Sequence, residues 1–345
     1  MELLQKICHE YDLGTPVAEP VALQGGLMHK MYSLFTEKGR YAVKLLNPRV
    51  MRREAAMSNF RAAEALELQL EQNGLPILPA LRLRGRKMQE LDGQYFYLYP
   101  WYAGKTLREN EVGAFHCRRM GELLARIHRL DWRDEPREYE ALRIDWDSYL
   151  DPLAARDAEL HALLLQNLEL LSHCQAERNA AIRALPSAVA ICHNDMDCKN
   201  VLWLGDECRV IDLECLSYSN PFLELYETAL CWAGFERGRV DDSLLEALVR
   251  SYAEAGGRLP ADWETIYHSA QGRLEWLAYN LDRALGVGCA AEEAALGASE
   301  AKKTLTQVRA YRGAREEILR CLRRAGGIGM PKEAEPICNK QGGIR

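Results

Sequence analysis

A polar stretch near the middle of the chain has residue types and spacing that suit phosphoryl transfer. It reads ICHNDMDCKNVLWLGDECRVIDLE, in which Asp195 precedes Asn200 by five residues and Asp212 follows twelve residues later. Two apolar runs after Asn200, separated by a Gly-Asp-Glu turn, predict a hairpin. This hairpin would fold Asp212 back beside Asn200, so that the two side chains could act at one site.

The residue types match the parts of a phosphotransferase reaction. Because Mg²⁺ prefers oxygen ligands, the Asp212 carboxylate and the Asn200 carbonyl oxygen are candidate metal ligands. Asp195 can orient an attacking hydroxyl and accept its proton. His193 can brace the loop through hydrogen bonds. Lys199 either helps to neutralise the γ-phosphate or points outward into solvent, and the spacing leaves both interpretations open.

The alternative is that these acids serve only as turn residues, which is a common use of aspartate and asparagine. An isolated H-x-D is frequent in proteins. The pattern H-x-D-x-x-x-x-N, followed by an apolar strand, a turn and I-D-x-E, is much rarer, and here it lies about 150 residues after an Ala-Val-Lys sequence. This combination favours a kinase.

A hairpin near the N-terminus, with a glycine pair at its mouth, could hold the phosphates. Gly25 and Gly26 precede a β-rich run, and a second strand is expected over Arg40–Leu46. The period of two in a strand places Ala42 and Lys44 on the same face. The alanine leaves room for a flat base, and the lysine ammonium can reach phosphate oxygens. Glycine pairs and strand lysines also occur for turn geometry and solvation alone.

A helix predicted over Arg52–Gln72 carries several glutamates. One of them could pair with Lys44 and hold it in place, as in the lysine–glutamate pair of kinases. The spacing favours Glu64 over Glu54 for this pairing. Most acids on the helix are expected to face solvent.

A connector is expected after two further strands, Ala80–Arg84 and Gln94–Tyr99. The sequence YPWYAGKTL follows, and its proline and glycine indicate a link between a β-rich part and the helical remainder. Backbone groups around Tyr99, Trp101 and Tyr102 could bond the edge of a nucleotide base. The aromatic side chains could equally serve only to pack the two parts together.

The rest of the chain has mainly helical periodicity. Apolar residues at helical spacing predict helices over Val112–Leu130, 151–185 and Ser299–Arg324. His128, near the end of the first of these, is expected to satisfy local hydrogen bonds rather than to bind a ligand. A tail over 330–345, which follows a glycine pair, is expected to be poorly ordered.

Composition limits the class of protein. The chain has 345 residues, of which 48% are hydrophobic, and this length suggests two lobes. A net charge of −6 and a pI near 5.9 argue against a general nucleic-acid binder. The eleven scattered cysteines form no C-x-x-C pair, so they predict reduced thiols in the cytoplasm rather than a zinc site. No apolar run approaches the ~18–20 residues of a membrane-spanning helix.

Taken in order, these motifs resemble the aminoglycoside phosphotransferase and choline kinase superfamily, which are small-molecule relatives of protein kinases. The resemblance covers roughly residues 20–285. It rests on Gly25-Gly26, Ala42-Val43-Lys44, YPWYAGKTL, LLARIH, HNDMDCKN and VIDLE. It implies an α+β, two-lobed, protein-kinase-like fold, with an N-lobe over 1–100 and a C-lobe over 101–329. ATP, with GTP as the alternative nucleotide, would bind between them with Mg²⁺.

The resemblance also implies roles for individual residues. Asp195 matches the catalytic base, Asn200 and Asp212 match the magnesium ligands, and Lys44 matches the phosphate-binding lysine. Asn194 stands where protein kinases have the arginine of H-R-D, which disfavours protein substrates. We therefore expect a small-molecule alcohol as substrate, bound by a monomer or homodimer.

The substrate is less well defined by the sequence. Glu224 occupies a position where the superfamily usually has aspartate, and the helical sequence GRLEWLAYNLDRALG carries Glu275, Trp276, Tyr279 and Asn280. Acids and aromatic rings on such a helix could bind a cationic amino group. They could equally be core and rim residues. An aminoglycoside-like substrate ranks ahead of choline, ethanolamine or another metabolite alcohol, and a regulatory pseudokinase is the contrasting hypothesis.

Overall fold

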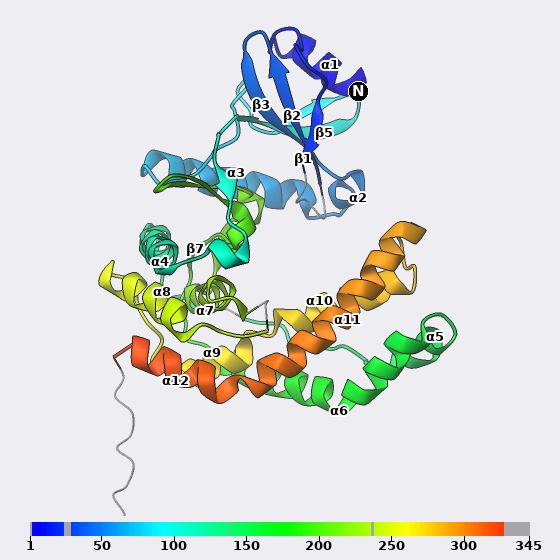
Figure 1. The fold of residues 1–345 in the computed structure, drawn as a ribbon, viewed down its shortest axis with the longest axis vertical. Coiled ribbons are helices and arrows are strands. Elements are labelled where there is room, and N and C mark those ends of the chain that lie inside the picture. Colours follow the sequence, from blue (N-terminus) through cyan, green and yellow to red (C-terminus); the bar gives the residue numbers. More distant parts are fainter. Residues whose placement is uncertain (1, 24–28, 137, 236–237, 328–345) are drawn as a thin grey trace, which may run out of the picture.

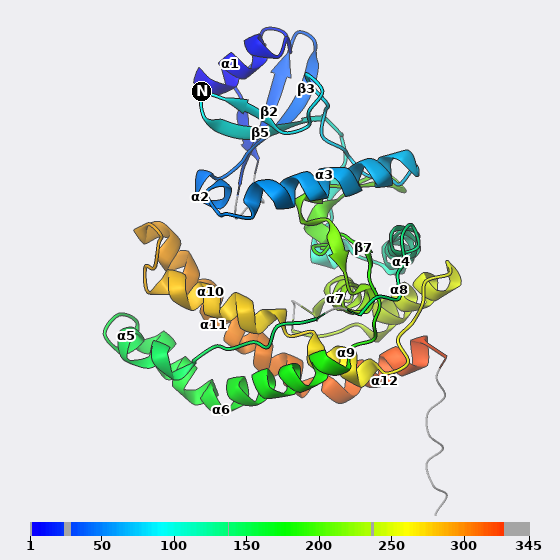
Figure 2. The ribbon, with the colours of Figure 1, turned by 180° about the vertical axis from the view of Figure 1, so that it is seen from behind.

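The computed structural model describes residues 2–23, 29–136, 138–235 and 238–327. Within these residues a β-rich lobe lies above a larger, mainly helical lobe, which Figure 1 and Figure 2 show from opposite sides. The expected α+β, two-lobed fold is therefore confirmed. Gly25, Gly26 and the predicted tail over 330–345 lie outside the described residues.

The β-rich lobe is built on a five-stranded antiparallel sheet with the order β1-β2-β3-β5-β4. Its strands are β1 Val21–Leu23, β2 Lys30–Thr36, β3 Gly39–Leu45, β4 Gln89–Leu91 and β5 Gln94–Pro100. The prediction of a strand over Ala80–Arg84 is wrong. Arg84 and Gly85 have φ angles of 50° and 80°, so the chain turns there instead of continuing extended.

The two faces of the sheet pack against different helices, as the alternation in β3 predicts. Val43 is buried in a cluster with Ile7 of α1 (Glu2–Glu10). On the other face, Ala42 and Lys44 pair across strands with Tyr99 and Tyr97. That second face is covered by α2 (Pro48–Met51) and α3 (Ala56–Gln72), which in both ribbon views lies between the sheet and the helical lobe.

Helix α3 also belongs to the core of the helical lobe. Its Leu66 and Leu70, and Ile77 after it, are buried in the same cluster as the helical lobe's central side chains. The segment after α3 is joined to that lobe through its backbone as well, because Leu78 donates to the carbonyl of Val210 at 2.8 Å and Val210 donates back to Pro76 at 2.8 Å. The two lobes therefore share α3.

Nine helices form most of the described part of the second lobe. They are α4 Ala114–His128, α5 Leu150–Ala154, α6 Ala158–Ala181, α7 Pro221–Trp232, α8 Asp242–Glu254, α9 Trp263–Ser269, α10 Gly272–Ala284, α11 Ala291–Gly313 and α12 Arg315–Ala325. The predicted helix over Val112–Leu130 corresponds to α4. The runs predicted as single helices over 151–185 and Ser299–Arg324 are each divided in two. The first breaks at Asp157, whose extended backbone and side chain cap α6.

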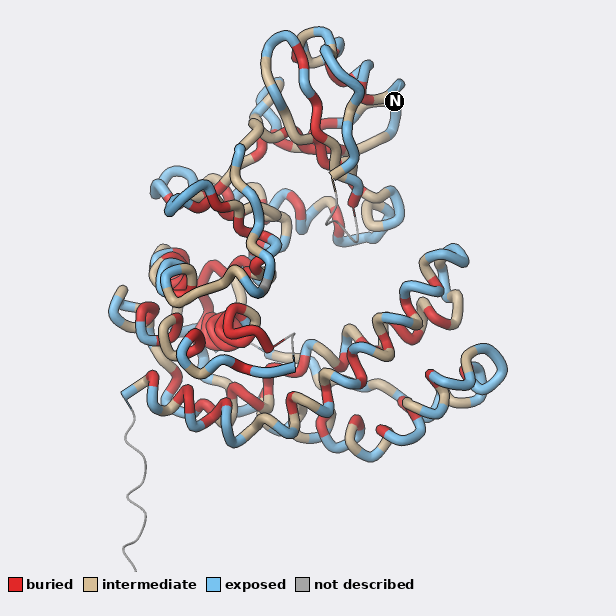
Figure 3. The backbone as a smooth tube through the Cα atoms, in the orientation of Figure 1, coloured by how far each residue is buried: buried red, intermediate tan, exposed pale blue. Residues whose placement is uncertain are grey.

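Short strands hold the polar stretch in place. They are β6 Lys105–Thr106, β7 Ala190–Cys192, β8 Val201–Leu204, β9 Glu207–Val210 and β10 Ser217–Ser219. The predicted hairpin is β8 and β9, which pair antiparallel, and β7 pairs with β10. Figure 3 shows the surrounding helices buried along their inner sides, and α7 buried along nearly its whole length.

The ten cysteines in the described part of the chain are all free, and most are buried. Among the described residues, no helix combines the length and the apolar character that crossing a bilayer requires.

Candidate active site

The loop after β7 brings Asp195 and Asn200 into direct contact. The Asn200 side-chain amide donates to the Asp195 carboxylate and to its backbone carbonyl, both at 2.8 Å. A short 3₁₀ turn, Cys198–Asn200, makes the loop compact enough for this contact. Lys199 lies beside it, with Nζ 3.4 Å from Asp195 Oδ1 and 2.7 Å from Asp197 Oδ2. The lysine is exposed to solvent and also pairs with acids of the loop, so both interpretations from the sequence stay open.

The hairpin returns Asp212 to this loop. The backbone N–H of Ile211 donates to the carbonyl of Asn200 at 2.9 Å, which places the following residue beside Asn200. Asp212 itself has φ 62°, a left-handed conformation that aspartate tolerates better than most residues, and it ends the β9 strand. The structure thus brings Asp195, Asn200 and Asp212 together.

Lys44 joins the same group from the sheet. Its Nζ lies 2.5 Å from Asp212 Oδ1 and also contacts the carboxylate of Glu214. The prediction that Glu64, or Glu54, pairs with Lys44 is wrong. Glu64 is engaged elsewhere, because its carboxylate accepts from the Tyr97 hydroxyl at 2.9 Å and from the Met88 backbone N–H at 3.1 Å.

His193 is a buried brace below the loop. Its Nε2 lies 3.0 Å from the carbonyl of Ile211, and its Nδ1 accepts from the backbone N–H of Asp195 at 3.3 Å. A carbonyl can only accept and an N–H can only donate, so the ring carries its proton on Nε2. His193 has no exposed surface with which to contact a substrate. Its contacts fit the bracing role that the sequence predicts.

The electrostatics of the loop favour a base at Asp195. Burial raises the pKa of the Asp195 carboxyl above its usual range and the charge of Asp197 adds to this, whereas Lys199 and Asn200 oppose it. Burial would lower the pKa of Lys199, but the charges of Asp197 and Asp195 outweigh it and raise that pKa. A base with a raised pKa accepts a proton more readily, as the proposed reaction requires.

The donor atoms suit a hard cation. Asn200 uses its amide nitrogen to bond Asp195, and among the described residues no donor contacts its Oδ1. Asp212 already holds a cation, the Lys44 ammonium. An amide oxygen and a carboxylate side by side are the type of ligand that Mg²⁺ takes in phosphotransferases. Asn200 and Asp212 therefore fit the metal role that their spacing suggests.

The connector residues lie at the end of β5. The Trp101 N–H donates to the carbonyl of Arg40 at 3.1 Å and so extends the sheet, while the Arg40 guanidinium lies 3.5 Å above the Trp101 ring. The Tyr102 ring packs where a side chain at Gly104 would overlap it. The aromatic rings of Trp101 and Tyr102 thus serve packing, and a base would be bonded by backbone groups at Tyr99 to Tyr102.

Glu224 is not placed to bind a substrate, so that prediction is wrong. It is buried beneath the loop, where its carboxylate accepts from the backbone N–H of Asn194 at 2.5 Å and lies 2.7 Å from His128 Nε2. His128 in turn contacts the Tyr252 hydroxyl at 2.9 Å. Burial would raise the pKa of Glu224, but His128, His193 and the hydrogen bond from the Asn194 N–H together outweigh it and lower that pKa. Glu224 ties α7 to α4 and to the catalytic loop.

Replacing Glu224 by alanine is expected to destabilise the fold by about 3 kcal/mol, because the buried His128 ring and the Asn194 N–H would both lose their partner. Chemical denaturation of the variant would measure this loss. Glu224→Asp, which keeps the charge, should lose less. A Glu224→Ala protein of unchanged stability but with a raised KM would instead return this residue to the substrate site.

The four candidates on α10 differ in position. Asn280 is fully buried, with its amide bonded to the carbonyl of Trp276 at 2.8 Å and to Arg283 at 3.1 Å, so its predicted role as a substrate contact is wrong. Glu275 is exposed. The rings of Trp276 and Tyr279 are partly exposed and stack at 5.4 Å. These last three keep surface that a small molecule could reach.

Two carboxylates near the site were not identified from the sequence. Glu214, two residues after Asp212, contacts Lys44, and the glutamate of I-D-x-E was a signal for it. Glu227 is the exposed acid of α7, and it lies near Asp197 and Arg273, which both influence its pKa. An acid three residues after Glu224 in an otherwise apolar helix was the available signal.

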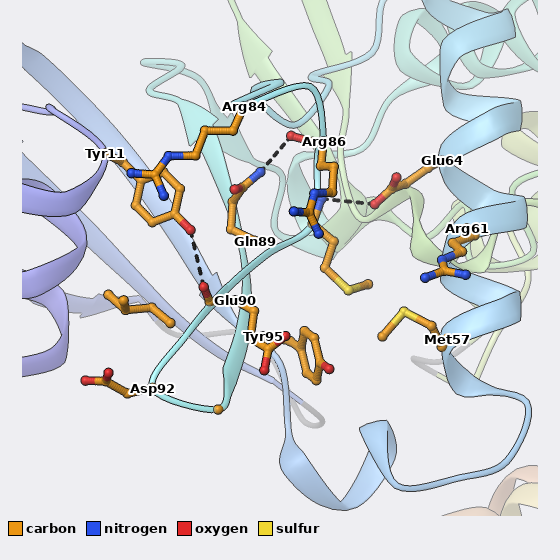
Figure 4. A pocket seen from close by; sticks show the side chains of 13 residues that line it. Tyr11, Met57, Arg61, Glu64, Arg84, Arg86, Gln89, Glu90, Asp92 and Tyr95 are labelled. Atoms are coloured by element: carbon orange, nitrogen blue, oxygen red, sulfur yellow. Dashed lines mark hydrogen bonds between the residues drawn. The ribbon is translucent and has the colours of Figure 1, made fainter.

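A pocket of about 540 Å³ lies away from this group, at the outer edge of the β-rich lobe (Figure 4). It is bounded by α3, through Arg61 and Glu64, and by the strands β4 and β5, through Glu90 and Tyr95. Glu64 is the one candidate from the sequence that lines it.

Comparison with known proteins adds the family. A family model described as "Phosphotransferase enzyme family" matches residues 20–266. The homoserine kinase of Pseudomonas aeruginosa is 29% identical over 191 residues, which are 53% of this chain and 57% of that enzyme. The matched region therefore spans little more than half the length of this relative.

Solved structures share the fold. Spectinomycin phosphotransferase, in complex with ADP and spectinomycin, has a TM-score of 0.68 at 14% identity, and the match covers 90% of this chain and 98% of that one. A microcompartment-associated aminopropanol kinase has a TM-score of 0.61 at 16% identity, with 93% and 99% covered. At these identities the likeness shows a kinase-like fold.

Proposed function

The chain belongs to the phosphotransferase enzyme family. On this premise we propose that it is a small-molecule kinase, which transfers the γ-phosphate of ATP to a hydroxyl of a small, amine-bearing molecule in a Mg²⁺-dependent reaction. The observation that carries the proposal is the convergence of Lys44, Asp195, Asn200 and Asp212. These groups come from a strand, a loop and a hairpin, and turn geometry alone does not require them to meet.

Each group has a distinct role in the proposed reaction. Asp195 orients the substrate hydroxyl and takes up its proton, aided by its raised pKa. Lys44, which is held by Asp212 and Glu214, offers its ammonium to phosphate oxygens. Asn200 and Asp212 would hold Mg²⁺, whose charge helps to neutralise the transferred phosphoryl group. His193 and Glu224 keep the loop in the shape that these roles need.

The nucleotide and the amine are supported by separate observations. A structural neighbour binds ADP, which supports an adenine nucleotide as donor, and GTP could use the same phosphate contacts. Beside the loop, Glu227 and Glu275 are exposed carboxylates that could attract a cationic amine. The relatives' names refer to homoserine, spectinomycin and aminopropanol, and each of these molecules carries both an amine and a hydroxyl.

The proposal is tested by following ADP release with a panel of alcohols in the presence of Mg²⁺ and ATP. The panel should contain aminoglycosides, spectinomycin, L-homoserine, aminopropanol, choline, ethanolamine and a neutral sugar. Turnover of at least one amine-bearing alcohol, in excess of ATP hydrolysis without substrate, is expected. Tight ATP binding with no turnover of any alcohol would contradict the proposal and would favour a regulatory pseudokinase.

A further inference from the structure

Helix α7 presents one stripe that is not buried. Along Pro221–Trp232 the residues that retain exposed surface are Leu223, Glu227 and Cys231, at the i, i+4 and i+8 positions of one helix face. Only Glu227 among the three is charged, and it is also the most exposed. The other faces of α7 are buried and mainly apolar. A carboxylate on its exposed stripe is therefore a candidate for contact with a ligand.

The stripe lies between the catalytic loop and α10. One turn beyond Glu227, Cys231 is hydrogen-bonded to the side chain of Asp197 in the loop. On the other side, a Cβ atom added to Gly272 at the start of α10 would lie 3.8 Å from Glu227 Oε1. Glu227 therefore reaches solvent at the point where the loop of Asp195 and the first turn of α10 come close to α7.

Arg273, the next residue of α10, brings the opposite charge to this point. Its guanidinium lies 4.4 Å above the ring of Phe235 and 5.0 Å from that of Tyr311, which fix its position. Among the described residues, neither Arg273 nor Glu227 forms an ion pair, with each other or with a third group. Arg273 lies close enough to Glu227 for its charge to lower the pKa of that carboxyl, and both side chains keep exposed surface.

The surroundings of Glu227 strengthen the case for a cationic ligand. Glu227 keeps exposed surface, but the protein atoms packed around its carboxyl exclude part of the solvent and raise its pKa to about 7. The charge of Arg273 lowers this pKa, and the charges of Glu224, Asp197 and Glu275 raise it further. Like charges nearby destabilise the ionised carboxylate, and a bound ammonium would stabilise it. Glu227 reaches solvent even though these groups surround it, as expected of a residue on the wall of a ligand site.

We propose that Glu227 and Arg273 bind the ammonium and the carboxylate of one small zwitterion, so that the substrate class is a hydroxylated amino acid. This inference rests on the proposed phosphotransferase function. An amine without a carboxylate would leave Arg273 unpaired, and a polycationic amine would be repelled by it. In the reaction, the substrate oxygen forms the new bond to the γ-phosphorus, the bond to the ADP oxygen breaks, and the hydroxyl proton passes to Asp195.

A matched series of three alcohols tests the two contacts separately. L-Homoserine carries both charges, 3-aminopropan-1-ol lacks the carboxylate, and 4-hydroxybutyrate lacks the ammonium. Because a hydrogen bond between charged groups contributes more than a neutral one, kcat/KM for L-homoserine is expected to exceed that of each analogue by about 10- to 100-fold. Equal use of 3-aminopropan-1-ol and L-homoserine would overturn the inference.

Single substitutions test whether Glu227 binds the ammonium of the substrate and Arg273 its carboxylate. Glu227→Gln should raise KM for L-homoserine and 3-aminopropan-1-ol but not for 4-hydroxybutyrate, and Arg273→Gln should abolish the preference for L-homoserine over 3-aminopropan-1-ol. Arg273→Lys keeps the charge if loss of the guanidinium disturbs its packing on Phe235. The controls are Glu292→Gln and Arg320→Gln, exposed residues of α11 and α12 that should change neither constant.

The failures of the two proposals can be told apart. No turnover of any alcohol, in this series or in the wider panel, would refute the phosphotransferase function itself. Turnover of spectinomycin or aminopropanol that does not depend on Arg273 would retain that function and refute only the amino-acid substrate class.

The pH dependence of KM provides an independent readout. Glu227 has a raised pKa, so it is neutral at low pH and becomes the anion that attracts an ammonium as the pH rises through about 7. KM for L-homoserine should therefore fall as the pH rises between about 5 and 9, a range in which the substrate amine stays largely protonated. In Glu227→Gln this component should disappear, and a profile identical to that of the wild type would count against the assignment.

Discussion

Replacing Asp195 by alanine is expected to lower kcat by about 10²- to 10⁴-fold while ATP still binds. The Asp195 carboxylate accepts a hydrogen bond from Asn200, and burial raises its pKa. Its loss therefore removes the proton acceptor but leaves the contact between Lys44 and Asp212 in place. The phosphate contacts should remain. Steady-state ADP release and calorimetric titration with ATP measure the two quantities separately.

Two further variants sharpen this experiment. Asp195→Asn keeps a side chain that can bond Asn200 but cannot accept a proton, so it should be nearly as inactive as the alanine variant. Asp206→Ala makes the same kind of change at the exposed β8–β9 turn and should leave kcat unchanged. If Asp195→Ala retained wild-type turnover, the assignment of the catalytic base would have to be abandoned.

Replacing Asp212 by asparagine is expected to lower kcat by about 10³-fold and to raise the Mg²⁺ concentration needed for half-maximal activity. The carboxylate contributes charge to the proposed metal site, and a metal ion at a phosphoryl centre supplies several kcal/mol of charge stabilisation. Lys44 would keep its contact with Glu214, so the sheet and the loop should stay together. Rates measured across a Mg²⁺ titration give both parameters.

Glu214→Gln is the matched control for Asp212→Asn. It removes the other carboxylate that contacts Lys44 but leaves Asp212 in place, so the Mg²⁺ dependence should stay close to that of the wild type. If Asp212→Asn changed kcat without any change in Mg²⁺ dependence, the residue would be a partner of Lys44 and not a metal ligand.

Local spacing predicted the contacts that depend on short pieces of chain. Asp195 and Asn200 are five residues apart in one tight loop, and the hairpin that returns Asp212 is signalled by its turn residues. The prediction that Glu64 pairs with Lys44 failed because it depended on which side of α3 faces the sheet at each position, and the sequence does not show this orientation. The orientation is set by tertiary packing, which turns Glu64 toward Tyr97.

The sequence also did not show which polar residues are buried. Glu224 and Asn280 looked available because polar side chains are usually exposed, yet each completes a buried hydrogen-bond network between helices. In α7, apolar residues occupy nearly every face, so periodicity could not show which stripe is open. Glu227 was overlooked for the same reason.

The sharing of α3 between the lobes has a mechanical consequence. If the two lobes move relative to each other when ATP binds, residues 1–100 cannot move as one rigid body. Leu66 and Leu70 of α3 are buried in the core of the helical lobe, so this part of α3 would stay with that lobe. Any movement of the sheet relative to α3 would also have to disturb the packing of Phe60 against Tyr97 and the hydrogen bond between Glu64 and Tyr97. Lys44 belongs to the sheet, whereas Glu214 belongs to the helical lobe. Such a movement would therefore change the distance between the phosphate-binding lysine and the catalytic loop.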